Sequence, residues 1–213
     1  LASGAPSLTG IGQTVITDVH RLNSEIKLRA SDGAKNDYFG RGARISGTTI
    51  VTGAYGDDTT FTDTGSSYYY RLDPTDLSFP ELKITASDAA ASDWYGLVTD
   101  IDGLNSVVGA YQDDTTVTDG GSLYINRLNP SSNANVQTKL TASDTATSDL
   151  FGRSVGIFGN SVIAGAYADD DTASASGSLY LYRMNPSTYA YSQTKIVASD
   201  PAASDFFGFS SGI

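Results

Sequence analysis

The chain has 213 residues, a length that one large all-β domain accounts for, and 39% of them are hydrophobic. Its formal net charge of −11 argues against nucleic acid as a partner, because nucleic-acid binding needs a basic surface. The absence of Cys excludes disulfides and thiolate metal sites, and no apolar run approaches the ~20 residues that cross a membrane. We therefore expect neither nucleic-acid binding nor membrane insertion.

The dominant feature of the sequence is an internal repeat of 56 residues. The tripeptide Ala-Ser-Asp begins at positions 30, 86, 142 and 198, and Gly-Ala-Tyr begins at positions 53, 109 and 165. A pair made of an aromatic residue and Gly keeps the same step, at Phe39, Tyr95, Phe151 and Phe207. Several landmarks in one register indicate a repeat protein.

In chain order, the first predicted strands are residues 1–6, 13–22 and 25–30, which match the second, third and fourth strands of the later units. Complete units follow at about 39–86, 95–142 and 151–198. Their strands are clearest at 152–158, 161–167 and 178–183, with a fourth strand of the kind seen at 137–142. Val, Ile, Thr and Tyr form these stretches, and Gly, Asn, Asp and Pro separate them. Residues 207–213 match a first strand alone.

Four short strands per unit at this period predict a blade of a β-propeller. We therefore predict an all-β fold, a single propeller domain over residues 1–213 with four-stranded antiparallel blades. One of its four blades is split between residues 1–30 and 207–213. The lone first strand either closes the ring of its own chain or completes the split blade of a neighbour, and head-to-tail contacts of the second kind build rings or filaments.

The landmarks resemble the FG-GAP repeat, which occurs in integrin α-subunit propellers and in secreted microbial and algal proteins. The naming residues are Phe39-Gly40, Phe151-Gly152 and Phe207-Gly208, with Gly4-Ala5-Pro6 as the intact Gly-Ala-Pro element. This resemblance implies propeller blades and an extracellular or cell-surface location. Such propellers commonly have seven blades, whereas this chain encodes four. A four-bladed ring, a fragment of a longer or processed chain, and an assembly of several chains therefore stay open.

The resemblance also implies calcium as a candidate cofactor, in an Asp-rich loop after the second strand of a blade. Hard cations take six to eight oxygen ligands, so closely spaced carboxylates are the requirement. The candidate ligands are nine aspartates in three such loops: Asp57, Asp58, Asp63, Asp113, Asp114, Asp119, Asp169, Asp170 and Asp171. The alternative is that these side chains hold turns by bonding their own backbone.

A second set of aspartates precedes the first strand of each unit, and its regular spacing predicts a shared structural role in Asx-turns or inter-blade hydrogen bonds. Its members are Asp32 with Asp37, Asp88 with Asp93, Asp144 with Asp149, and Asp200 with Asp205.

Catalysis is poorly supported by the sequence, and we expect no enzyme. The one His, His20, stands in a predicted strand, and no nucleophile elbow, zinc motif or phosphate loop has a credible context. Carboxylates repeat in every unit, whereas an active site is usually singular.

Binding of glycans is the alternative function that the sequence supports. Aromatic faces stack on sugars, and the candidates beside the Asp loops are Trp94, Tyr95, Tyr111 and Tyr167. O-linked glycosylation is a further candidate at the loop threonines Thr59, Thr60, Thr115 and Thr116.

Two functions follow. The first is an extracellular structural or adhesive module that acts through protein-protein contacts, with itself or another extracellular protein, and self-assembles head to tail through the split blade. The alternative is a carbohydrate-binding, lectin-like propeller, with or without calcium.

Overall fold

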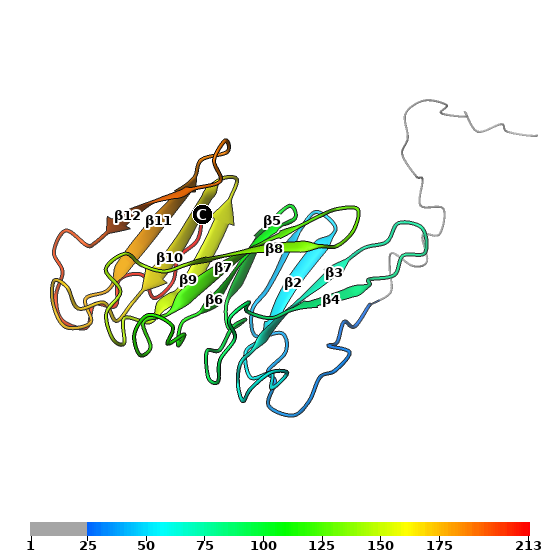
Figure 1. The fold of residues 1–213 in the computed structure, drawn as a ribbon, viewed down its shortest axis with the longest axis horizontal. Coiled ribbons are helices and arrows are strands. Elements are labelled where there is room, and N and C mark those ends of the chain that lie inside the picture. Colours follow the sequence, from blue (N-terminus) through cyan, green and yellow to red (C-terminus); the bar gives the residue numbers. More distant parts are fainter. Residues whose placement is uncertain (1–24) are drawn as a thin grey trace, which may run out of the picture.

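The computed structural model describes residues 25–213. Over these residues it contains three four-stranded antiparallel sheets and no helix, which confirms the all-β prediction (Figure 1). We number the sheets blade 1 to blade 3. The predicted strands at residues 1–6 and 13–22, and His20, lie outside the described residues.

The strands of each blade follow one another in simple antiparallel order. Blade 1 consists of β1 (Ala43–Ser46), β2 (Thr49–Ala54), β3 (Ser66–Arg71) and β4 (Glu81–Ile84). Blade 2 consists of β5 (Thr99–Asp102), β6 (Asn105–Ala110), β7 (Ser122–Leu128) and β8 (Asn135–Leu140). Blade 3 consists of β9 (Phe151–Phe158), β10 (Ser161–Ala166), β11 (Ser178–Met184) and β12 (Tyr191–Ile196).

The predicted strands correspond closely to the observed ones. Ranges 152–158, 161–167 and 178–183 differ by one residue at one end from β9, β10 and β11, and 137–142 is shifted by two residues from β8. Phe158 pairs with Ser161 across a tight turn at Gly159-Asn160, where Gly159 has φ 57°. Positive φ at this position is what a two-residue hairpin requires.

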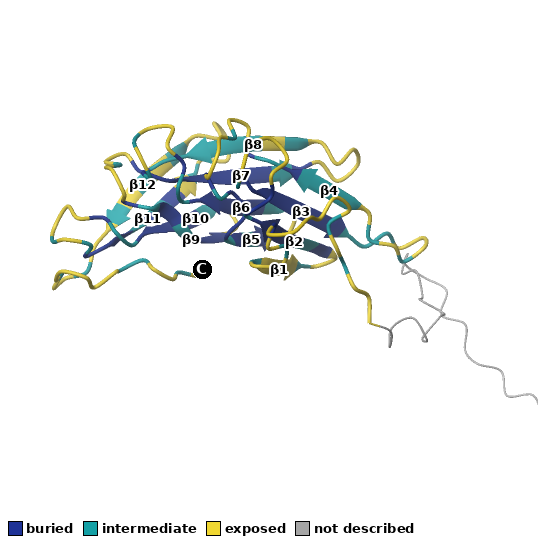
Figure 2. Cartoon of the chain, turned by 90° about the horizontal axis from the view of Figure 1, so that it is seen from below, coloured by how far each residue is buried: buried dark blue, intermediate teal, exposed yellow. Residues whose placement is uncertain are grey.

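The blades pack face to face through residues of the repeat (Figure 2). Ile101 of β5 lies in a buried cluster with Val51 and Tyr69 of blade 1. Ile157 of β9 lies in the corresponding cluster with Val107 and Ile125 of blade 2. The first strands β1, β5 and β9 lie side by side along one edge, as the inner strands of a propeller do (Figure 2).

The Gly residues of the two main landmarks meet at the blade junctions. A Cβ on Gly109 would lie 2.1 Å from the carbonyl oxygen of Gly152, and one on Gly53 would lie 1.7 Å from that of Gly96. Only Gly permits such an approach of two backbones. The Gly-Ala-Tyr and aromatic-Gly landmarks are therefore two halves of one contact between successive blades.

The described residues do not close a ring, and two predicted strands are absent. Residues 25–30 form no strand, and residues 207–213 form only an isolated bridge between Phe207 and Gly177. A strand needs a hydrogen-bonding neighbour. Neither segment has one among residues 25–213, because the expected neighbours, 13–22 and 1–6, lie outside them. No helix suited in length and hydropathy to crossing a membrane occurs in this part of the chain.

Candidate functional site

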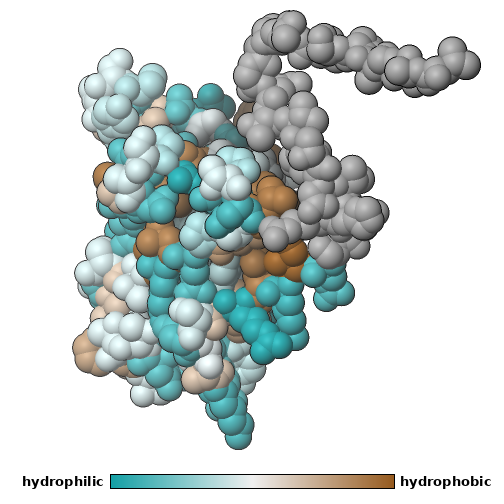
Figure 3. Space-filling view, turned by 90° about the vertical axis from the view of Figure 1, so that its right-hand side faces the viewer, coloured by the Kyte–Doolittle hydropathy of each residue, from teal (hydrophilic) through white to brown (hydrophobic). Residues whose placement is uncertain are grey.

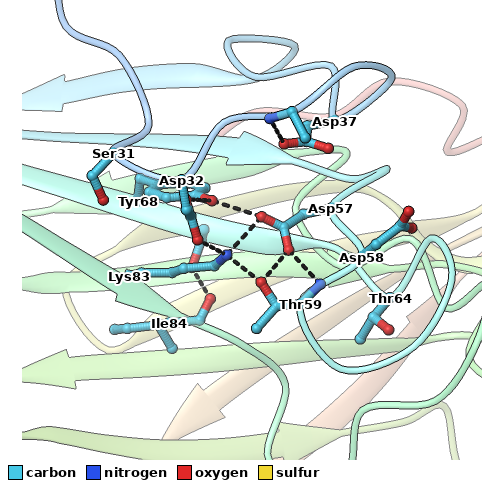
Figure 4. Close-up of polar contacts among 12 residues, drawn as sticks. Ser31, Asp32, Asp37, Asp57, Asp58, Thr59, Thr64, Tyr68, Lys83 and Ile84 are labelled. Carbon is cyan, nitrogen blue, oxygen red and sulfur yellow. Dashed lines mark hydrogen bonds and ion pairs between the residues drawn. The ribbon is translucent and has the colours of Figure 1, made fainter.

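The Asp-rich loops each enclose a lysine from the fourth strand of the same blade. In blade 1, Lys83 Nζ lies 2.5 Å from Asp32 Oδ2 and 2.7 Å from Asp57 Oδ2 (Figure 4). In blade 2, Lys139 Nζ lies 2.6 Å from Asp88 Oδ2 and 2.7 Å from Asp113 Oδ2. The two aspartates of each pair come from different landmarks, so the lysine fastens the loop to the Ala-Ser-Asp segment.

Blade 3 repeats this arrangement with one more carboxylate. Lys195 Nζ lies 2.8 Å from Asp144, 2.7 Å from Asp169 and 2.6 Å from Asp171. Ligand oxygens of these three aspartates lie within 4.8 Å of one another. The ammonium group thus stands where three negative charges converge.

A buried tyrosine from the third strand completes each cluster. The Tyr68 hydroxyl lies 2.7 Å from Asp57 Oδ2 and 2.9 Å from Asp32 Oδ1, and Tyr124 and Tyr180 make the equivalent contacts in blades 2 and 3. The backbone N–H of Thr59 donates to the other oxygen of Asp57, at 2.8 Å. Both carboxylate oxygens of Asp57 are therefore engaged, and its residue is only 3% exposed.

The charge of the cluster is set by these contacts. Burial alone would raise the pKa of Asp57, but hydrogen bonds from Lys83, Thr59 and Tyr68 outweigh it and lower the pKa to about 2. Burial also favours a higher pKa at Asp169, but hydrogen bonds from Lys195 and Tyr180 outweigh it and lower the pKa. Asp57 and Asp169 are therefore ionised at neutral pH and pair with Lys83 and Lys195.

A row of aromatic side chains crosses from blade to blade beside these loops. Tyr38 stacks on Tyr55 at 4.8 Å between ring centroids, Tyr55 contacts Trp94 at 5.3 Å, and Trp94 contacts Tyr111 at 5.7 Å. Tyr38 is 54% exposed, and Tyr55, Trp94 and Tyr111 are half-buried. We call Tyr38, Tyr55, Trp94 and Tyr111 the aromatic row.

The remaining predicted sugar contacts fall in two other places. Tyr95 is fully buried, and its hydroxyl lies 2.9 Å from Asn126 Nδ2 and 3.2 Å from Ser67 Oγ. Its prediction as a ligand residue is therefore wrong, because the aromatic-Gly landmark places that ring between blades. Tyr167 contacts Phe206 and Phe209 near the end of blade 3.

Comparison with known proteins agrees with this architecture. The family model of the FG-GAP repeat matches residues 22–70, 80–126 and 135–182. The chain belongs to the FG-GAP repeat family. No curated protein was found to match it. The three FG-GAP matches include the strands of blades 1 and 2 and the first three strands of blade 3, except for the last one or two residues of β3, β7 and β11.

Calcium, which FG-GAP repeats often bind, competes here with lysine. The inner carboxylates of the loops, on Asp57, Asp113 and Asp169, already bind an ammonium group and a tyrosine hydroxyl. A calcium ion needs six to eight oxygens and would have to displace that ammonium group. The residues of these loops therefore do not fit calcium while the lysine is in place.

The outer aspartates of the loops hold backbone groups. Asp58 Oδ1 accepts the N–H of Asp63 at 2.8 Å, and Asp114 Oδ1 accepts that of Asp119 at 2.6 Å. These bonds close the loop, which is the role expected if the aspartates maintain turns. Asp170 and Asp171 are exposed. Calcium at any of the nine aspartates stays a prediction.

The second set of aspartates has the structural role that its spacing predicts. Asp37, Asp93, Asp149 and Asp205 each accept the backbone N–H of the Ala three residues earlier. Asp32, Asp88 and Asp144 bind the lysines. Burial raises the pKa of Asp93 to about 6, and burial does the same for Asp149.

The candidate O-glycosylation threonines divide into two kinds. Thr59 and Thr115 place their hydroxyls against Lys83 and Lys139 inside the clusters. All four residues are exposed. Glycosylation stays a prediction, and the hydroxyls of Thr59 and Thr115 are the two that a lysine already contacts.

The lysines were the functional residues that sequence reasoning missed. Lys83, Lys139 and Lys195 keep the 56-residue step, and Lys27 stands one step earlier. That periodicity was the available signal.

Proposed function

We propose that this chain is an extracellular structural or adhesive FG-GAP module that acts through protein-protein contacts and assembles head to tail with copies of itself. FG-GAP repeats are typical of extracellular interaction modules without catalytic activity, and this chain matches them across three blades. Another extracellular protein is the alternative partner.

Docking of residues 207–213 on blade 3 carries the proposal. The N–H of Phe207 donates to Ser176 O at 2.9 Å, as Phe151 donates to Gly120 O and Tyr95 to Thr64 O, both at 3.1 Å. Phe207 bridges Gly177 just as Phe151 bridges Gly121. The segment therefore begins a further blade on blade 3, and our proposal is that a second copy supplies the remaining strands of that blade.

The isoleucines of the repeat show what such a partner would cover. Ile101 is 7% exposed and Ile157 is 5% exposed, whereas the equivalent Ile213 is 54% exposed and Ile45 is 67% exposed. Figure 3 views the molecule from the blade 1 end, and hydrophobic side chains are visible on that face. Both ends of the array thus carry apolar positions that are buried wherever two blades meet.

Sedimentation velocity across a range of protein concentrations tests this function. The native chain is expected to form species heavier than one 22.3 kDa chain as concentration rises. Ile213→Asp is expected to weaken that association, and Val136→Asp is the matched control, because Val136 is 63% exposed on β8 of the middle blade. A native chain that stays monomeric at every concentration would overturn the proposal.

Carbohydrate binding is the second candidate, and the aromatic row supports it. Its rings are partly exposed and cross the junction between blades 1 and 2 through the contact of Tyr55 with Trp94. Trp94 and Tyr38 both have φ 56°, and Leu150 and Phe206 at the same repeat position have φ 59° and 54°. This left-handed backbone is therefore a property of the repeat, and the support for sugar binding is the row of ring contacts alone.

A glycan array with and without chelator tests the second candidate. Binding that is lost in Trp94→Ala and kept in Tyr189→Ala is the expected result, since Tyr189 is 65% exposed but lies on the β11–β12 loop. No binding to any glycan in either condition would count against a lectin.

A further inference from the structure

The junctions between successive fourth strands are held by one repeated set of polar contacts. The backbone N–H of Ser87 donates to Gln137 Oε1 at 2.7 Å, and Asp88 binds Lys139 at 2.6 Å. Gln137 and Lys139 belong to β8, while Ser87 and Asp88 follow β4. The Ser-Asp turn after one blade therefore binds the fourth strand of the next blade through a backbone N–H and a carboxylate. We call this pair of contacts the junction latch.

The latch occurs three times with the same spacing. Ser31 and Asp32 bind Glu81 and Lys83 of β4, at 3.0 and 2.5 Å. Ser143 and Asp144 bind Gln193 and Lys195 of β12, at 3.1 and 2.8 Å. The partners are 50 and 51 residues apart in every copy. The geometry is thus a property of the repeat and not of one blade.

Two half-latches remain within residues 25–213. Ser199 and Asp200, one step after Ser143 and Asp144, are exposed and have no partner in this part of the chain. Glu25 and Lys27, one step before Glu81 and Lys83, are likewise exposed and without a partner among the described residues. The first half offers an N–H and a carboxylate, and the second offers a carboxylate and an ammonium group.

We propose that these halves form a fourth latch between two copies of the chain, with Ser199 and Asp200 of one copy bound to Glu25 and Lys27 of the next. The proposal rests on the head-to-tail assembly above and assigns the residues that recognise the partner. Lys27 binds Asp200, and the Glu25 carboxylate accepts the N–H of Ser199, as in the three observed latches.

The positions of the two halves favour a second copy over closure within one chain. Residues 25–30 lie at the blade 1 end of the array, coloured blue, and residues 199–200 lie beyond blade 3 at the opposite end, coloured orange-red (Figure 1). Buried hydrophobic clusters join each pair of blades between them. Opposite ends that carry complementary halves form a heterologous contact, which repeats from copy to copy.

The test is sedimentation velocity of two charge-reversal variants, alone and mixed. In Lys27→Asp the proposed contact between copies opposes two carboxylates, and in Asp200→Lys it opposes two ammonium groups, while the three latches within each chain are unchanged. Each variant alone is expected to associate about tenfold or more weakly than the native chain. An equimolar mixture restores opposite charges at every contact and is expected to restore association. Lys35→Asp, which makes the same charge change at an exposed residue outside the latch, is expected to behave as the native chain.

The outcomes separate the latch from the proposed function. Native association that is unchanged in both single variants would overturn the latch and leave head-to-tail assembly standing. Single variants that are monomeric and unfold more easily, with stability recovered in the doubly substituted chain but not on mixing, would place the latch within one chain and overturn the contact between copies. A native chain that never associates would overturn both proposals.

Discussion

The ammonium group of Lys139 lies 2.7 Å from the Asp113 carboxylate, and this pair joins the fourth strand of blade 2 to the loop after its second strand. The Asp113 side chain is 2% exposed and that of Lys139 is 19% exposed, so the pair is largely withdrawn from water. Its counterparts in blades 1 and 3 have the same geometry. A buried pair of this kind is costly to break, because removing one partner leaves the other charge buried without a counter-ion.

Replacing Lys139 is therefore expected to destabilise the fold. In Lys139→Met, the Asp88 and Asp113 carboxylates lose their counter-ion, and we expect a loss of about 3 kcal/mol in the free energy of unfolding. Lys35→Met is the matched control, because Lys35 is exposed and makes no ion pair within the described residues. Its cost should stay within about 0.5 kcal/mol. Urea denaturation measures both, and equal losses would contradict a special role for Lys139.

Calcium is expected to act only after a lysine is removed. The melting temperature of the native chain should not change with millimolar calcium or with chelator, because the ammonium groups already occupy the position between the converging carboxylates. Lys195→Met leaves the converging oxygens of Asp144, Asp169 and Asp171 free for a hard cation. Calcium should raise the melting temperature of this variant. A native chain that chelator destabilises would show that the metal, and not lysine, holds the loops.

The raised pKa values of two buried aspartates predict how the stability of the fold depends on pH. The pKa values of Asp93 and Asp149 rise from 3.8 to about 6 on folding, so the native state binds more protons than the unfolded chain between those values. Stability should then fall as the pH increases from about 4 to 6. Asp57, whose pKa falls to about 2, acts in the opposite direction and only below 3.8.

Substitution of both residues isolates their contribution. Asn at positions 93 and 149 still accepts the backbone N–H bond but does not ionise. Urea unfolding at several pH values between about 4 and 7 should show a smaller decline for Asp93→Asn/Asp149→Asn than for the native chain. Identical declines would mean that these carboxyls titrate normally in the folded protein.

A single methyl group at a blade junction should disrupt the array. The Cβ of Gly109→Ala would lie 2.1 Å from the backbone oxygen of Gly152, which cannot move without separating blades 2 and 3. We expect a loss of more than about 3 kcal/mol, or failure to fold. Gly47→Ala is the control, because Gly47 has φ 57° but no atom near its Cβ position, so only the left-handed backbone costs about 1 kcal/mol. Thermal melts compare the two variants, and similar melting temperatures would contradict the close approach.

The blades were predictable because strand formers, turn residues and landmarks repeat in one register. The hairpin at Gly159-Asn160 and the bounds of β9 to β11 follow from local pattern alone. The backbone N–H bonds of Asp37 and its equivalents were also predictable, since an Asx-type contact needs only neighbouring residues.

The sites were less predictable, because they depend on residues that are distant along the chain. The sequence around Asp57 predicts a calcium ligand, and nothing adjacent to it shows that Lys83 enters the same loop from β4. The sequence around Tyr95 predicts a sugar contact, whereas the structure places its ring in the junction between blades. The strands predicted at 25–30 and 207–213 do not form among residues 25–213, and their expected neighbours, 13–22 and 1–6, lie outside the described residues.

The most direct test of the assembly is a zero-length cross-link between Lys27 and Asp200 in a mixture of isotopically heavy and light chains. Mass spectrometry of the digested product distinguishes links within one chain from links between two. The proposed contact predicts cross-linked peptides that join a heavy to a light chain at these two residues. Links that join only peptides of the same isotope would show closure within one chain and contradict the assembly.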